Sequence, residues 1–114
     1  MLTESQQEWY ARHLLLDEFG GEGQERLLAA GAHVHGTGPA ALWAARYLAA
    51  SGIGDLEVDV AAWREELRGL GPWLTAGVPA GHRVHLTPAE GTTLAESAMN
   101  GARAALEAIR RIIR

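Results

Sequence analysis

The chain has 114 residues, a formal net charge of −4, an apolar fraction of 47% and no cysteine. This length suits one small globular domain, and the lack of cysteine excludes disulfides, thiolate metal ligands and a thiol nucleophile. The acidic balance argues against nucleic acid as a partner, and no apolar run is long enough for a membrane span. The polar, acidic start is unlike a signal peptide, so we expect a cytoplasmic protein.

The sequence contains no lysine, although it has ten basic residues. All ten are therefore arginines. Any contact with a phosphate must come from arginine or from backbone N–H groups, and Schiff-base chemistry through a lysine side chain is excluded.

Two helices are predicted ahead of the first strand. A capping box at Thr3 begins the first helix, which ends before the two glycines at 20–21. The second helix covers about residues 22–30, and Gly31 follows it as a helix-ending glycine. We interpret residues 1–31 as a helical extension of the domain.

A short strand, a glycine turn and a helix start follow at residues 32–41. The turn has the pattern G-x-G-x-x-A at Gly36, Gly38 and Ala41. The first glycine permits a tight turn, the second lets a phosphate approach the backbone, and the small third residue lets helix and strand pack closely. Pro39 suits the first helical position. The turn is either a cradle for a nucleotide phosphate or a tight turn without a ligand.

The remaining pattern alternates helices and strands. The predicted elements are a helix over 39–50, a strand over 55–60, a helix over 61–70, a loop over 69–81, a strand over 82–86 and a helix from 93 onward. Such alternation predicts a parallel sheet with helical crossovers. We expect an α/β fold: a small three-layer Rossmann-like sheet of about three strands with two N-terminal helices. The chain would be a single domain over 1–114, with its core over 32–114.

The last helix has the strongest amphipathic pattern. Thr93 and Glu96 have the spacing of a capping box. The spacing predicts one apolar stripe, made of Leu94, Ala98, Ala102, Ala105, Leu106, Ile109 and Ile113. On the polar side, Glu107 is spaced for ion pairs with Arg103 and Arg111.

The five histidines give a weaker signal. His33 and His35 alternate on one strand face beside the glycine turn, His82 and His85 flank another strand, and His13 is on the first helix. Two or three of them could meet at a metal ion. Because no cysteine or carboxylate completes a ligand pattern, we expect no metal site and structural or half-exposed histidines.

Four segments together resemble a known family. They are WYARHLLL at residues 9–16, GGEGQERL at 20–27, the glycine turn at 36–41, and YLAASGIGDL at 47–56. In this order and spacing they resemble the N-terminal signature of the ThiF/MoeB/HesA adenylyltransferases, which activate ubiquitin-like sulfur-carrier proteins. The resemblance covers about residues 4–60. The chain looks like a short, truncated and degenerate version of the N-terminal half of such an enzyme.

The resemblance implies ATP binding, adenylation of a carrier's C-terminal glycine, use of Mg²⁺ together with ATP, and a homodimer. It implies that Arg12, the arginine of the first motif, reaches the ATP phosphates of the partner subunit. A guanidinium fork suits phosphate oxygens. An ion pair with Glu8, Asp17 or Glu18 is the alternative for this arginine.

The chain also departs from the family pattern. The family has D-x-D after its second strand, where an acidic residue holds the ribose, and here only Asp59 is a candidate. Its alternative is a strand-end carboxylate in water. The arginine of the next family segment could be Arg64 or Arg68, neither in the matching context. The family's phosphate-binding lysine, its Mg²⁺-binding aspartate and its cysteines have no counterpart, and Pro39 replaces a glycine, which removes a backbone N–H.

Two functions follow from this comparison. The first is a non-catalytic partner or dimerisation module in a ubiquitin-like or sulfur-carrier system, without catalytic residues. Its partner would be a second copy, a carrier or a fuller adenylyltransferase, and a separate chain could supply the missing half. The second is an ATP-binding adenylyltransferase-like domain, with Arg12, Gly36, Gly38, Ala41 and Asp59 around the nucleotide.

Overall fold

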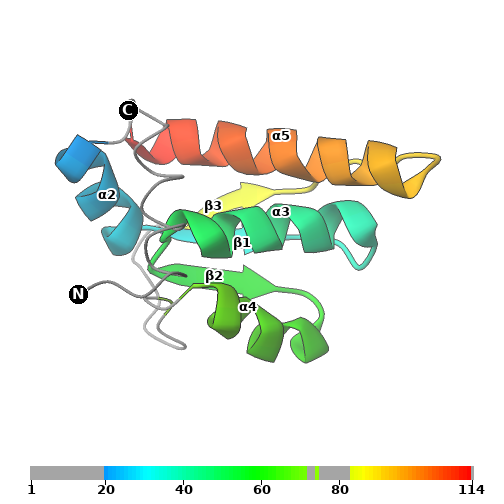
Figure 1. The fold of residues 1–114 in the computed structure, drawn as a ribbon, viewed down its shortest axis with the longest axis horizontal. Coiled ribbons are helices and arrows are strands. Elements are labelled where there is room, and N and C mark those ends of the chain that lie inside the picture. The colour runs from blue at the N-terminus through cyan, green and yellow to red at the C-terminus, as the bar shows by residue number, and fades with distance from the viewer. Residues whose placement is uncertain (1–19, 72–73, 75–82, 114) are drawn as a thin grey trace, which may run out of the picture.

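The structure is a computed structural model, and it describes residues 20–71, 74 and 83–113. The elements alternate between helix and strand (Figure 1). In chain order they are α2 (Gly20–Ala29), β1 (Gly31–Val34), α3 (Pro39–Ser51), β2 (Asp55–Val58), the short 3₁₀ helix η1 (Ala61–Trp63), α4 (Arg64–Leu70), β3 (Arg83–Leu86) and α5 (Leu94–Ile113). The helix expected to start at Thr3 lies outside the described residues.

The three strands form one parallel sheet in the order β2-β1-β3. Gly31 pairs with Asp55 on one side and with Arg83 on the other, and the register continues to the end of β1. The expected α/β class and the three-stranded parallel sheet are confirmed. Because β1 is the central strand, the glycine turn that follows it lies in the middle of the sheet's carboxyl edge.

The core lies on the face of the sheet that carries Ala32 and Val34. Both residues are fully buried in one cluster with residues of α3, α4 and α5. Helices α3 and α5 run side by side, and α3 passes across the sheet (Figure 1). Alanine dominates this side of α3, because small side chains let a helix approach both a sheet and a second helix.

The opposite face of the sheet carries polar side chains. Asp55 on β2 accepts a hydrogen bond from Arg83 Nε on β3 at 2.6 Å, across the central strand. Gly31 lies between them in the register and has no side chain to obstruct the pair. Among the described elements the helical layer is on the other face, so the expected three-layer arrangement is not confirmed.

The expected second helix is present with slightly different bounds. Helix α2 begins at Gly20, two residues before the expected start, and ends at Ala29. Gly31 follows it at a distance of one residue. Positive φ angles in the described chain occur at Gly36 and Gly52, whereas Gly31 begins β1.

The other boundaries are close to the expected ones. Strand β1 lies one residue earlier than expected, and β2 ends at Val58 rather than at residue 60. The stretch after β2 starts as a 3₁₀ turn before α4. None of the helices in the described part of the chain is long and apolar enough to cross a membrane.

Candidate functional site at the glycine turn

The turn between β1 and α3 has the geometry that its glycines permit. Gly36 has a φ of +121°, a conformation that residues with a side chain rarely adopt. A Cβ added there would also lie 3.2 Å from the Cβ of Ala41, which is fully buried. Gly38 is the N-cap of α3 in an extended conformation, and Pro39 follows at the first helical position. These residues occupy the positions expected from the motif.

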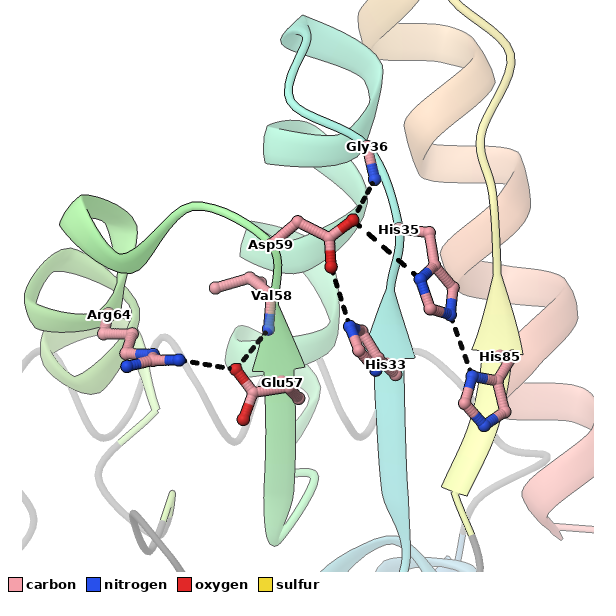
Figure 2. Close-up of polar contacts among 8 residues, drawn as sticks. All are labelled: His33, His35, Gly36, Glu57, Val58, Asp59, Arg64 and His85. Atoms are coloured by element: carbon pink, nitrogen blue, oxygen red, sulfur yellow. Dashed lines mark hydrogen bonds and ion pairs between the residues drawn. The ribbon is translucent and has the colours of Figure 1, made fainter.

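Asp59 lies directly after β2 and reaches over to the turn. Its Oδ2 accepts a hydrogen bond from the backbone N–H of Gly36 at 2.9 Å (Figure 2). Its Oδ1 lies 2.9 Å from His33 Nε2. The hydrogen bond from Gly36, followed by that from His33, lowers the pKa of Asp59 below its ordinary value. The structure therefore brings Asp59 together with Gly36, which the sequence analysis left open.

A second carboxylate binds the amino end of α3. The N–H of Ala40 donates to both oxygens of Glu90, at 3.1 and 3.0 Å. A Cβ added at Gly38 would collide with this carboxylate. Glu90 thus lies in the space that the second glycine leaves open. Free N–H groups and the helix dipole make this position favourable for an anion.

The turn in this conformation does not fit a nucleotide phosphate. Its Gly36 and Ala40 N–H groups already donate to the carboxylates of Asp59 and Glu90. A phosphate would have to displace Glu90 or lie beside it against charge repulsion. Asp59, in contrast, lies beside the first glycine, which is the position of a carboxylate that binds the ribose of a nucleotide.

Arg64, one of the candidate arginines, does not point toward the turn (Figure 2). Arg64 pairs with Glu57 of β2 at 2.9 Å, on the side of β2 away from the turn (Figure 2). That pair is the main reason why the pKa of Glu57 is lowered. Arg12 lies outside the described residues, so its role in phosphate binding remains a prediction.

Sequence reasoning missed one feature of this region and considered a second without expecting it. Nothing in the local pattern marks Glu90, because it reaches the turn from the loop between β3 and α5. The second feature is a cluster of His33, His35 and His85, whose ligand atoms all lie within 4.8 Å of one another. Same-face alternation of His33 and His35 was visible in the sequence, but the pairing of β3 with β1 was not.

The fold and the turn define a small parallel α/β domain with the Gly-x-Gly-x-x-Ala turn of nucleotide-binding folds after its central strand. No family model matches the chain. It is 46% identical over 57 residues to "SAMP-activating enzyme E1" of Haloferax volcanii. It is 49% identical over 57 residues to "Probable molybdopterin-synthase adenylyltransferase" of Gracilaria tenuistipitata var. liui. These matches confirm the resemblance to the ThiF/MoeB/HesA adenylyltransferases.

The similarity is confined to a part of each protein. Each matched stretch covers 50% of this chain, but only 21% of the first relative and 16% of the second. Because the similarity covers so little of each relative, it does not by itself show that this chain has the activity of a whole adenylyltransferase.

Proposed function

We propose that this chain is a non-catalytic partner domain in a ubiquitin-like or sulfur-carrier system. The observation that carries the proposal is the hydrogen bond from the N–H of Ala40 to the Glu90 carboxylate. This carboxylate lies in the space that a side chain at Gly38 would fill. Transfer of an adenylyl group needs positive groups around the phosphates. The glycine turn presents carboxylates instead, and the sequence has no lysine to offset them.

The names of the two relatives support the choice of system. One is named for activating SAMP, and the other is named as an adenylyltransferase of molybdopterin synthase. We infer that this domain keeps a fold used in such activation and binds a protein of the same system. The partner would be a second copy of the chain, a carrier protein or a fuller adenylyltransferase.

One observation favours ATP binding as the second candidate. Asp59 lies at the end of β2 with its carboxylate 2.9 Å from the N of Gly36, where a ribose could replace this contact. In this case Gly36, Gly38 and Ala41 would line the nucleotide, Mg²⁺ would bind only with ATP, and Glu90 would have to move. Arg12 would then contribute the positive charge that the described turn does not present.

The affinity of the wild-type chain for ATP separates the two candidates, and removal of Glu90 tests whether this carboxylate is what excludes the phosphate. We expect the wild-type chain to bind ATP with a Kd of millimolar or weaker, with or without Mg²⁺, in calorimetric titrations. Substitution Glu90→Ala frees the N–H of Ala40 and removes a negative charge, so ATP affinity should increase at least fivefold. The control substitution Glu107→Gln removes a charge of α5 that pairs with Arg111 and is not part of the turn, so it should leave the affinity unchanged.

Pyrophosphate exchange with a carrier protein completes the test. The non-catalytic proposal expects no exchange from wild type or from Glu90→Ala. Submillimolar ATP binding by wild type together with exchange would overturn it in favour of the enzyme. An unchanged affinity in Glu90→Ala would show that Glu90 is not the group that excludes phosphate.

A further inference from the structure

Three histidines meet on the polar face of the sheet, at its carboxyl edge (Figure 2). His33 on β1 and His85 on β3 are direct partners in the parallel register. His35 follows β1 on the same face as His33, because side chains two residues apart in an extended chain point the same way. Each offers a ring nitrogen, and these atoms all lie within 4.8 Å of one another.

The three rings lie next to one another in a stack. His33 and His35 stack with centroids 4.0 Å apart, and His35 and His85 stack at 5.1 Å. His35 Nε2 lies 2.9 Å from His85 Nδ1. Tetrahedral coordination with metal–nitrogen bonds of about 2.0–2.1 Å needs nitrogens roughly 3.4 Å apart. To bind one ion the rings must turn out of their stack so that their nitrogens point to a common centre. The surface position leaves room for this movement, since 22% of the His33 side chain and 38% of the His35 side chain are exposed.

Asp59 supports the cluster from the side of β2. Its Oδ1 lies 2.9 Å from His33 Nε2, and its Oδ2 lies 3.9 Å from His35 Nδ1 while the N–H of Gly36 holds it in place. A carboxylate that accepts a hydrogen bond from an imidazole orients the ring and leaves its other nitrogen free to bind a metal. This arrangement of carboxylate and histidine is common around metal ions in proteins.

We propose that His33, His35 and His85 bind a divalent transition-metal ion of the Zn²⁺ type, with Asp59 as the carboxylate that orients His33. Imidazole ligands select such ions over Mg²⁺ and Ca²⁺, which prefer oxygen. Three protein ligands leave one coordination position for water or another ligand. The geometry thus differs from the sequence-based expectation of no metal site, and it does not depend on the function proposed above.

The charges around the cluster also favour a cation. Asp59 contacts two of the histidines, and Glu57 is the register partner of His33 on β2. Arg64 pairs with Glu57, and Arg83 on β3 pairs with Asp55 one step back along the sheet. The nearest arginines are therefore occupied by carboxylates, and Asp59 faces the histidines directly.

Titration with Co²⁺ and Zn²⁺ tests the site in the full chain after treatment with a chelator. Co²⁺ should bind once per chain and give the visible absorption of a four- or five-coordinate ion, and Zn²⁺ should displace it. Substitutions His35→Ala and His85→Ala should each weaken Co²⁺ binding at least tenfold. Asp59→Asn should weaken it by about tenfold, the lower end of the effect of removing such supporting carboxylates. Circular dichroism verifies that each variant folds.

Two controls separate this site from other sources of binding. Glu107→Gln removes a carboxylate of α5 that pairs with Arg111 and is not part of the cluster, and it should leave the affinity for Co²⁺ within twofold. The double substitution His13→Gln and His82→Gln removes the histidines outside the described residues and should preserve binding. Unchanged binding in both His35→Ala and His85→Ala, or loss of binding in the double variant, would overturn the proposal.

Discussion

At Gly101, helix α5 comes closer to α3 than a side chain would allow. A Cβ at this position would collide with the carbonyl oxygen of Ala40 and would lie 2.9 Å from the N of Ala44. Both neighbours belong to the backbone of α3, so they cannot yield as a flexible side chain could. The tight packing of the two helices therefore depends on this glycine.

We expect Gly101→Ala to destabilise the protein by about 1–3 kcal/mol, the usual cost of overpacking. The gain in helix propensity, about 1 kcal/mol, offsets only part of this cost. Gly69→Ala is the matched control, because Gly69 is also in a helix and nothing lies within 4 Å of its added Cβ. It should be neutral or stabilising by up to about 1 kcal/mol. Urea unfolding measures both, and equal effects of the two substitutions would contradict the close-packing argument.

The buried face of α5 illustrates how packing selects residues at the level of an element. The expected stripe began at Leu94, but the Leu94 side chain is 73% exposed. The residues buried on this helix are Ser97, Gly101, Ala105, Ala108 and Ile109. Because α3 lies so close to α5, the residues of α5 that face α3 are small. The larger apolar residues of α5 lie on either side of them. The apolar stripe was therefore placed wrongly in part, whereas the helix and the predicted ion pair between Glu107 and Arg111 are observed.

The amino end of α5 is held by reciprocal hydrogen bonds. The N–H of Glu96 donates to Thr93 Oγ1 at 3.1 Å, as the capping box predicted. The Glu96 carboxylate accepts from the N–H and the hydroxyl of Thr92, at 3.2 and 2.8 Å, rather than from Thr93. These two bonds, first the one from the hydroxyl, lower the pKa of Glu96 below its ordinary value of 4.5.

Thr93→Ala should lower the free energy of unfolding by about 1 kcal/mol, because it removes the acceptor for the N–H of Glu96. Chemical denaturation at pH 7 measures this loss. Thr37→Ala is a control, since Thr37 is an exposed threonine in the glycine turn and no cap depends on it. An equal loss in both variants would argue against the cap.

The lowered pKa of Glu96 predicts a pH dependence of stability. Because the folded pKa lies below the unfolded one, the charged carboxylate stabilises the protein above about pH 4.5, and this contribution is lost as the pH falls through the folded pKa. The stability difference between wild type and Glu96→Gln should therefore be larger at pH 7 than at pH 3. Urea unfolding at both pH values checks this, and a pH-independent difference would contradict it.

At the scale of the whole molecule, α3 presents an aromatic surface to the outside. Trp43 and Tyr47 have ring centroids 6.1 Å apart, and the Arg46 guanidinium lies 5.0 Å from the Trp43 ring. Arg46 also pairs with Glu66 of α4. Tyrosine, tryptophan and arginine are the residue types enriched where proteins bind each other. Of the partners proposed above, a second copy of the chain is the one that we expect to contact this surface.

Substitution Tyr47→Glu should weaken self-association at least tenfold, because it places a charge in the centre of this surface. Sedimentation equilibrium measures the association constant. Leu94→Gln is the control, since Leu94 is an exposed apolar residue at the start of α5. A wild-type chain that stays monomeric at 100 µM, roughly the upper range for a specific dimer, would contradict the proposal.

Sequence reasoning recovered the elements better than their arrangement. The strands, the helices after them and the glycine turn follow from local patterns of apolar residues, glycine and proline, and they appear within one or two residues of the expected positions. Of the candidate site, Gly36 lies beside Asp59 and Ala41, whereas Arg12 is outside the described residues and binding of a nucleotide stays a prediction. The position of Glu90 depends on a loop fifty residues away from Ala40, and no local pattern reports such a contact.

The sequence by itself determined a small α/β domain of alternating strands and helices, its glycine turn and its resemblance to carrier-activating adenylyltransferases, because each rests on residues close together in the chain. Only the tertiary structure decided that β1 lies between β2 and β3. This strand order brings Asp59 and three histidines to the carboxyl edge of the sheet. The loop between β3 and α5 places Glu90 beside the glycine turn. Such contacts join distant segments, and they depend on the packing of the whole domain rather than on local propensity.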